Sequence, residues 1–202
     1  MPLLLQGLLL GLSIAAPVGP IGVLCIRRTL VLGRLSGLVS GLGAATADGF
    51  YGCVAGFGLT FLTQFLVEQT LWLRLIGGLF LIYLGAKIFV SQPAETAAAV
   101  APQSTLLGAY FSTLALTLTN PATILSFVAI FAGLGIAEGD RSYLDSSVLV
   151  LGVFLGSALW WWLLSWSVNL FRARFNPQRL RWLNRVSGLV MTAFGVVALG
   201  WR

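Results

Sequence analysis

Three long stretches of this chain contain no charged residue, and they constrain its fold more than any other feature. They run from Met1 to Ile26, from Thr96 to Ala137 and from Ser146 to Phe171. Each is longer than the roughly 20 residues that an α-helix needs to cross about 30 Å of hydrocarbon. Since 58% of all residues are hydrophobic and only 9% are charged, the sequence predicts an integral membrane protein.

Six membrane spans can be drawn, so the fold class that we expect is an all-α membrane protein. Arg74 and Lys87 lie near the ends of the third span, and their side chains would extend toward the lipid headgroups. The expected spans are Leu3–Leu24, Leu38–Phe65, Leu71–Val90, Leu106–Leu134, Val148–Phe171 and Leu183–Trp201.

The two halves of the chain resemble each other. Residues 91–105 contain two prolines and a run of alanines, a composition typical of a linker. Halves with three spans each must enter the membrane from opposite sides. We therefore expect one membrane domain, residues 1–202, built as two inverted three-helix repeats, 1–90 and 106–202. Residues that recur at one constant offset are Trp72, Gly78 and Gly85 in the first half and Trp182, Gly188 and Gly195 in the second.

The distribution of lysine and arginine predicts the orientation. With both termini outside, nine of these residues lie in cytoplasmic loops and three lie outside. Arg27 and Arg28, which follow the first span, belong to the cytoplasmic group. An N-out, C-out orientation is therefore favoured. The N-terminal stretch lacks a basic region before its apolar part, so we expect an uncleaved first span rather than a signal peptide.

Proline interrupts the first and the fourth span at corresponding places in the two halves. Pro20 stands in the sequence Ala16-Pro17-Val18-Gly19-Pro20, and Pro121 follows Asn120. Proline removes a backbone donor and breaks or bends a helix, and membranes tolerate this only where protein or a water-filled cavity satisfies the freed groups. Paired broken helices indicate the binding site of a secondary transporter, although such kinks are often only architectural.

Asp48 is the one ionisable residue that we expect deep inside a span. A carboxylate at the bilayer centre costs about 2.5–3.5 kcal/mol on insertion scales, so Asp48 should face the bundle interior. It would bind a substrate amine, carry a coupled proton or do both. A structural carboxylate, hydrogen-bonded to neighbouring helices, is the alternative. Around Asp48 runs a stripe of small residues that permits close helix approach or leaves room for substrate, namely Gly37, Gly41, Ala44, Ala45, Gly52 and Gly56.

Several classes of function are disfavoured. The chain has no histidine, and Cys25 and Cys53 lack a metal-binding spacing, so we expect no metal, no cofactor and two thiols packed as small apolar residues. No phosphate-binding loop or nucleophile–base pair is present, and we expect no enzyme activity. The basic segment Arg172–Arg185 adjoins a span and indicates contact with anionic lipid rather than nucleic acid.

Taken together, these motifs resemble the lysine exporter (LysE) family of amino-acid efflux proteins over nearly the whole chain. The resemblance implies export of amino acids or related small amines across the bacterial inner membrane, driven by the proton gradient. The sequence leaves open whether the cargo is basic or neutral. The paired helix breaks lead us to expect alternating access, and the small-residue helix faces permit a homodimer. The residues expected to bind or move the substrate are Pro17, Gly19, Pro20, Asp48, Tyr51, Asn120 and Pro121, with Asp48 also carrying the proton.

Two other functions remain as alternatives. A membrane thiol-disulfide electron carrier can also have six spans, but it would need a cysteine at each broken helix, and no cysteine lies near Pro121. A passive channel or a structural membrane subunit is the second alternative. It predicts a flux that does not depend on a proton gradient and that shows no saturable, stereoselective substrate.

Overall fold

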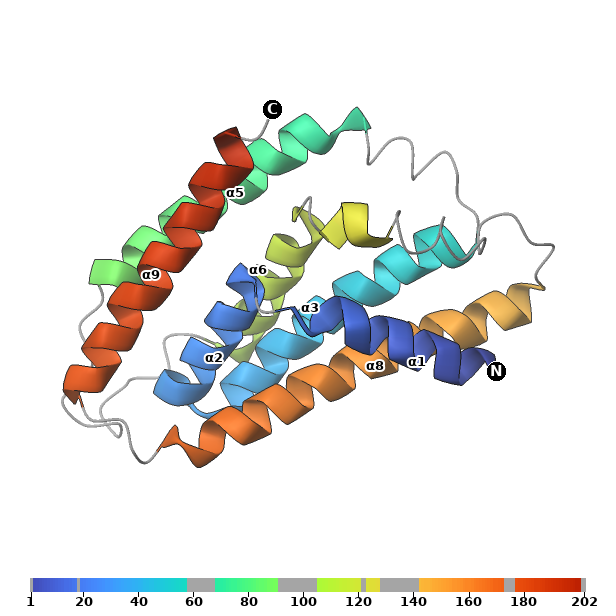
Figure 1. The fold of residues 1–202 in the computed structure, drawn as a ribbon, viewed down its shortest axis with the longest axis horizontal. Coiled ribbons are helices and arrows are strands. Elements are labelled where there is room, and N and C mark those ends of the chain that lie inside the picture. Colours follow the sequence, from blue (N-terminus) through green and yellow to red (C-terminus); the bar gives the residue numbers. More distant parts are fainter. Residues whose placement is uncertain are drawn as a thin grey trace.

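The computed structural model of this chain describes residues 2–17, 19–57, 68–90, 105–120, 123–127, 142–172 and 177–200. Within these ranges the backbone forms helices and turns without any strand, which confirms the all-α expectation. The helices are α1 (Leu3–Ala15), α2 (Pro20–Leu32), α3 (Arg34–Gly56), α5 (Thr70–Val90), α6 (Leu106–Leu118), α8 (Tyr143–Leu170) and α9 (Pro177–Gly200) (Figure 1).

The first predicted span consists of two helices. α1 ends at Ala15, α2 begins at Pro20, and the two are bent by 83° relative to each other. α2 continues to Leu32, whereas the sequence predicts a cytoplasmic loop that contains Arg27 and Arg28. That prediction is wrong, because both arginines lie in α2 and Arg28 is buried. Neighbouring helices supply hydrogen-bond acceptors for its guanidinium group, and the helix can therefore continue past the apolar stretch.

Other helices differ from the prediction mainly at their ends. α3 begins at Arg34 rather than Leu38, and α8 begins at Tyr143 rather than Val148. The hydroxyl of Ser142 accepts the Asp145 N–H, so α8 starts in a capped polar turn before its apolar part. The predicted ends of the second and fourth spans, and nearly all of the linker 91–105, lie outside the described residues.

By length and composition, three of the described helices could each cross a membrane: Leu71–Val90 of α5, α8 and Arg181–Gly200 of α9. The bent pair of α1 and α2 would add a fourth crossing if it counts as one span, and α6 is apolar but shorter. The expected total of six also depends on residues 58–67 and 128–141, which lie outside the described part of the chain.

Glycines bring α1 and α8 into close parallel contact along one edge of the molecule (Figure 1). A Cβ atom on Gly7 or Gly11 would overlap the backbone carbonyl of Leu149 or Val153. Gly156 in turn meets the backbone of Leu8. Small residues spaced four apart on both helices allow this approach, as in other membrane helix pairs.

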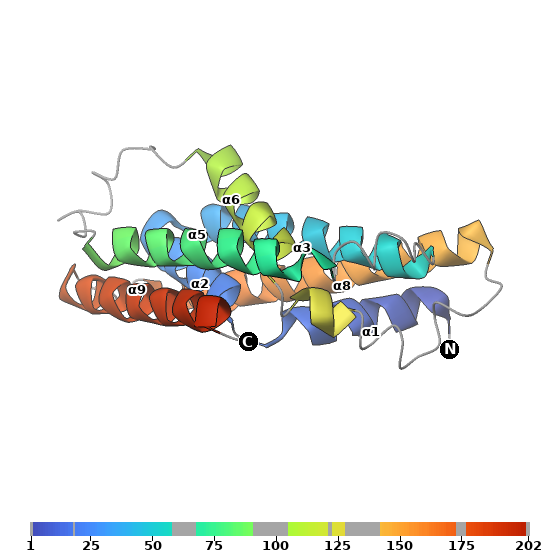
Figure 2. The same ribbon diagram turned by 90° about the horizontal axis from the view of Figure 1, so that it is seen from above.

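α5 and α9 lie side by side and antiparallel, as Figures 1 and 2 both show. Gly78 meets the carbonyl of Gly195, and Gly188 meets the carbonyl of Gly85. Gly78 and Gly85 of the first half correspond in sequence to Gly188 and Gly195 of the second half. The two contacts are therefore equivalent to each other. The pairing of α5 with α9 is therefore self-complementary.

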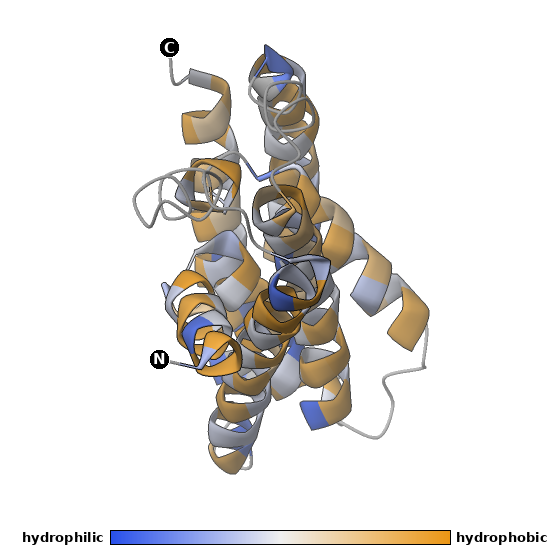
Figure 3. Ribbon diagram, turned by 90° about the vertical axis from the view of Figure 1, so that its right-hand side faces the viewer, coloured by the Kyte–Doolittle hydropathy of each residue, from blue (hydrophilic) through white to orange (hydrophobic). Residues whose placement is uncertain are grey.

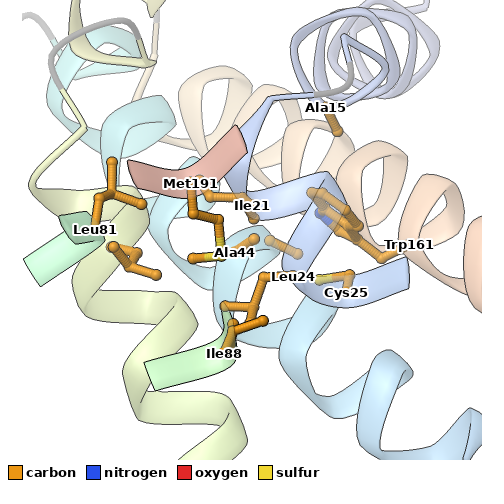
Figure 4. Close-up of a cluster of buried hydrophobic side chains, with 11 residues drawn as sticks. Ala15, Ile21, Leu24, Cys25, Ala44, Leu81, Ile88, Trp161 and Met191 are labelled. Atoms are coloured by element: carbon orange, nitrogen blue, oxygen red, sulfur yellow. The ribbon is translucent and has the colours of Figure 1, made fainter. Parts of the chain in front are cut away.

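The centre of the molecule is formed by α2 and α3, which α6, α8 and α9 contact directly, whereas α1 packs on α8 and α5 packs on α9. Apolar side chains from all seven of these helices meet there, with Leu24 and Cys25 of α2 between Ala44, Trp161 and Met191 (Figure 4).

Polar groups are buried and large apolar side chains face outward, which is the reverse of a soluble bundle. The hydroxyl-bearing residues Ser40, Thr113 and Ser157 are fully buried, whereas Leu79 and Tyr83 are exposed on α5. Apolar residues dominate the ribbon along most of the helices (Figure 3). Lipid rather than water suits such an exterior, as expected for an integral membrane protein.

Candidate transport site

Both helix breaks line a single cavity of about 540 Å³. Pro17, Gly19 and Pro20 come from the first break, and Thr119 and Asn120 come from the second. Small-molecule sites usually have volumes of roughly 300–1,000 Å³, so this cavity could hold an amino acid. The remaining lining residues are Ile14, Ile21, Gly77, Gly78, Leu81, Leu116, Thr123, Leu125, Ser126, Phe194, Val197 and Ala198.

The backbone of the first break follows from its proline and glycine. Pro20 occupies the first position of α2, where its missing N–H is not needed and its φ angle suits a helix. Gly19 is extended, with φ −98° and ψ −164°, and its N–H donates to the carbonyl of Pro17. The first N–H groups of a helix have no partner within that helix. α2 therefore begins at the cavity with its backbone donors.

At the second break, α6 ends at Leu118 and a new helical segment, residues 123–127, follows. The carbonyl of Asn120 accepts the N–H groups of Thr123 and Ile124 at 3.1 and 3.2 Å, so the new segment starts from Asn120. Pro121 lies outside the described residues. α6 thus brings the carbonyl end of a helix to the same cavity where α2 brings the amide end.

Tyr51 connects α3 to the second break. Its hydroxyl donates a hydrogen bond to the carbonyl of Leu118. This is one of the last carbonyls of α6, for which the helix itself supplies no N–H donor. The Tyr51 ring is buried and packs on Phe127, with ring centroids 5.6 Å apart. Tyr51 does not line the cavity; it holds the end of the helix that does.

Asp48 is buried between α3 and α8 and is not part of the cavity lining. The hydroxyl of Ser157 donates a 2.6 Å hydrogen bond to Oδ2 of Asp48, and the indole N–H of Trp161 donates to the Ser157 oxygen at 3.2 Å. Hydrogen bonds to an ionised acceptor are stronger than neutral ones, and a chain of donors reinforces them. Of the predicted site residues, the cavity brings together Pro17, Gly19, Pro20 and Asn120, while Asp48 and Tyr51 lie outside its lining.

The small-residue stripe around Asp48 is filled by neighbouring helices. A Cβ atom on Gly41 would overlap Trp161 of α8, and one on Gly37 would overlap the side chain of Thr29 on α2. Of the two uses that the sequence allows for such a stripe, the structure shows close helix approach at these positions.

Among the described residues, no ionisable side chain lines the cavity. Its polar side chains are two threonines, one serine and Asn120, whereas Leu81, Phe194 and Val197 contribute an apolar wall. Charge is therefore offered only by helix ends: the start of α2 carries a partial positive charge and the end of α6 a partial negative one.

Sequence reasoning missed two polar residues that the structure places in the interior. The sequence predicts a loop at Arg28, because this residue directly follows an apolar stretch. Ser157 gave no signal of its own, since a lone serine in an apolar helix is common. Its place in the Leu155-Gly156-Ser157-Ala158 match to Leu42-Gly43-Ala44-Ala45 is the one available indication. In the described ranges no group of three histidine, cysteine or carboxylate residues could hold a metal ion, and Cys25 and Cys53 are free thiols.

Comparison with known proteins places this architecture among transporters. A family model described as LysE type translocator matches residues 12–200. "Putative amino acid efflux protein YcgF" of Bacillus subtilis (strain 168) is 30% identical over 96% of this chain and 94% of its own length. "Uncharacterized membrane protein YahN" of Escherichia coli (strain K12) is 28% identical over 85% of this chain and 77% of its own length. No solved structure matches the chain.

Proposed function

We propose, since the chain belongs to the LysE type translocator family, that it exports neutral amino acids through the cavity between its two helix breaks. The shared cavity is the observation that carries this proposal. Gly19 before α2 and Asn120 after α6 line the same space, although they lie in different halves of the chain. Discontinuous helices that meet at one cavity are a common substrate site in secondary transporters.

The two helix ends suit the two charges of an amino acid. The start of α2 would bind the carboxylate, because its N–H groups and its dipole favour an anion. The end of α6 would attract the ammonium group through its carbonyls and the amide oxygen of Asn120. A zwitterion would then lie between Gly19 and Asn120, with its side chain toward α5 and α9.

The lining favours a neutral side chain over a basic one. A lysine or arginine side chain inside the cavity would bring a cation that no carboxylate among the described lining residues can pair. Burying an unpaired charge is costly, whereas Leu81, Phe194 and Val197 offer an apolar surface to an aliphatic chain.

Asp48 is assigned to the coupled proton. It lies outside the cavity lining, so direct binding of the substrate amine is the less favoured of its two roles. Ser157 stabilises its ionised form, and burial opposes that form, so the carboxyl group can alternate between the two. Exchange of a proton at Asp48 would then accompany movement of the helices that contact α3 and α8.

Transport by alternating access fits two halves that pack around a fixed site. The N-out, C-out orientation in a bacterial inner membrane remains our expectation from lysine and arginine placement. Anionic lipid would contact the basic segment that begins at Arg172, and exposed apolar faces such as that of α5 leave room for a homodimer.

Transport measurements separate these roles. Cells that overexpress the protein should release one or more neutral amino acids in excess of empty-vector cells, in an untargeted comparison of exported metabolites. The identified compound is then tested in inside-out vesicles for uptake driven by a proton gradient, and for exchange in the absence of a gradient. Exchange requires substrate binding and helix movement but no net proton flux.

Two variants should affect gradient-driven uptake and exchange differently. Asp48→Asn should abolish gradient-driven uptake and retain exchange, whereas Asn120→Ala should reduce both. Asp145→Asn, at the capped start of α8, is the matched carboxylate control and should behave as wild type. Full gradient-driven uptake by Asp48→Asn would remove Asp48 from coupling. Flux that neither saturates nor responds to the gradient would favour a channel, and loss of activity in a cysteine-free variant would favour the thiol-disulfide carrier.

A further inference from the structure

Arg28 of α2 is a buried cation that binds two other helices. Its Nη1 atom donates to the hydroxyl of Ser40 on α3 at 2.8 Å. The same atom donates to the carbonyl of Ala109 and the hydroxyl of Thr113 on α6, both at 2.9 Å. Nη2 donates to the hydroxyl of Ser112 at 2.7 Å. One guanidinium group thus joins α2, α3 and α6.

All four of these acceptors are neutral. Ser40 and Thr113 are fully buried, and no carboxylate among the described residues pairs with Arg28. A buried charge with neutral partners stabilises a fold less than a well-packed apolar side chain of similar size would. Ionisable groups inside membrane proteins usually serve a function for this reason. Arg28 is therefore a candidate for a functional role in addition to a structural one.

The Arg28 cluster adjoins one end of the cavity. Along α2, Arg28 lies about 12 Å beyond Pro20, which lines the cavity. Along α6, the cluster occupies the positions that precede Leu116, where the cavity lining of that helix begins. The guanidinium group therefore bridges α2, α3 and α6 beyond the residues of α2 and α6 that line the proposed substrate site.

Two further arginines hold the same end of α2. Arg27 donates to the side-chain oxygen of Asn184 on α9 at 2.8 Å. Arg172, at the end of α8, donates to the carbonyl of Leu30 at 3.2 Å, where α2 turns into α3 through Gly33. Gly33 has φ 101°, a conformation that favours glycine. This half of α2 is thus bound to α3, α6, α8 and α9 through arginine side chains.

We propose that Arg28 and its acceptors on α3 and α6 form the cytoplasmic gate of the transporter, which is closed in this structure. The assignment to the cytoplasmic side follows from the arginine-rich end of the bundle and rests on the proposed transport function. Opening moves α2 away from α6, and water replaces the hydroxyl and carbonyl acceptors of Arg28. Neutral acceptors suit a gate, because water can substitute for them more easily than for a buried carboxylate.

Thiol labelling tests the gate without substrate or gradient. The reporter is Ile21→Cys, a cavity residue between Pro20 and Arg28, in a chain that also carries Cys25→Ala and Cys53→Ala. A membrane-impermeant maleimide is added to right-side-out and inside-out vesicles. The labelling rate from each side is normalised to total labelling of the unfolded protein in detergent, so that differences in abundance do not matter.

Variants of the cluster should shift the cytoplasmic labelling rate in opposite directions. Arg28→Met should raise it about tenfold, the effect expected from losing one charge-assisted hydrogen bond or more. Thr113→Val, which keeps the side-chain shape, should raise it by a smaller factor. Ser112→Asp should lower it, because a carboxylate opposite Arg28 strengthens the closed state.

Thr117→Val is the matched control. Thr117 lies one turn beyond Thr113 on α6 and is equally buried, and among the described residues its hydroxyl donates only to the Thr113 carbonyl of its own helix. It should leave both labelling rates unchanged. The gate is wrong if Thr113→Val and Ser112→Asp shift the cytoplasmic rate no more than Thr117→Val does, even where Arg28→Met fails to accumulate. If the cluster variants shift the cytoplasmic labelling rate but the protein transports no amino acid, the gate is supported and only the proposed transport function is rejected.

Discussion

The hydroxyl of Tyr51 donates a hydrogen bond to the backbone carbonyl of Leu118, and this bond joins α3 to the end of α6 at the second helix break. Asp48 precedes Tyr51 by about one turn of the same helix. The two parts of the proposed site, the buried carboxylate and the cavity, are thus connected through a short segment of α3. Movement at Asp48 can reach the cavity through this contact.

Tyr51→Phe should lower both the rate of transport and the thermal stability of the protein. It leaves the Leu118 carbonyl without its donor, which costs roughly 1–3 kcal/mol, and it frees the end of α6 at the cavity. We expect a lower melting temperature in detergent and a several-fold lower rate of gradient-driven uptake. Tyr110→Phe is the control, because the Tyr110 hydroxyl joins α6 to Thr46 of α3 away from the break. Equal transport rates in the two variants would contradict the role of Tyr51.

Ser157→Ala should impair proton coupling. It removes the donor to Asp48 and leaves Trp161 without its acceptor, so the ionised carboxylate loses stabilisation. We expect the pH dependence of uptake to shift toward higher pH, and Ser157→Thr to restore it in part. Ser165 lies two turns further on α8 and is equally buried, but its hydroxyl has no hydrogen-bond partner within the described part of the chain. Ser165→Ala should therefore keep the wild-type pH profile, and a profile shifted as far as that of Ser157→Ala would contradict the prediction.

Alanine at Gly11 and alanine at Gly19 should have different effects. A Cβ atom on Gly11 would overlap the Val153 backbone, so Gly11→Ala should separate α1 from α8 and destabilise the protein by about 1–3 kcal/mol. At Gly19 a Cβ atom would meet no atom of the described residues within 4 Å. Gly19→Ala should keep the melting temperature but occupy part of the cavity and raise the apparent KM. Equal losses of thermal stability would show that the breaks serve packing alone.

A carboxylate placed in the cavity should change the substrate preference. Ser126→Asp puts an anion in a lining without an ionisable side chain among the described residues. We expect uptake of lysine or arginine relative to leucine to rise by about tenfold, as 1.4 kcal/mol of differential binding would produce. Ser147→Asp adds the same charge on an exposed part of α8 outside the lining. An unchanged ratio in Ser126→Asp, or an equal rise in Ser147→Asp, would place the substrate elsewhere.

Helix content and the positions of the breaks could be predicted because they depend on local properties of the chain. Pro20 cannot donate to the preceding turn, and α2 begins at this residue. The location of Arg28 could not be predicted in this way. A charged residue after an apolar stretch usually marks a loop, and only the acceptors on α3 and α6 make a buried helical arginine possible.

The sequence by itself determined that this is a helical membrane protein with broken helices in both halves, because hydropathy and proline act on the segment in which they occur. Only the tertiary structure decided that the two breaks share one cavity and that Asp48 lies beside Ser157 rather than in that cavity. It also decided that Arg28 of α2 is hydrogen-bonded to both α3 and α6. The physical reason is that these relations depend on how glycines far apart in sequence, such as Gly11 and Gly41, let particular helix backbones approach.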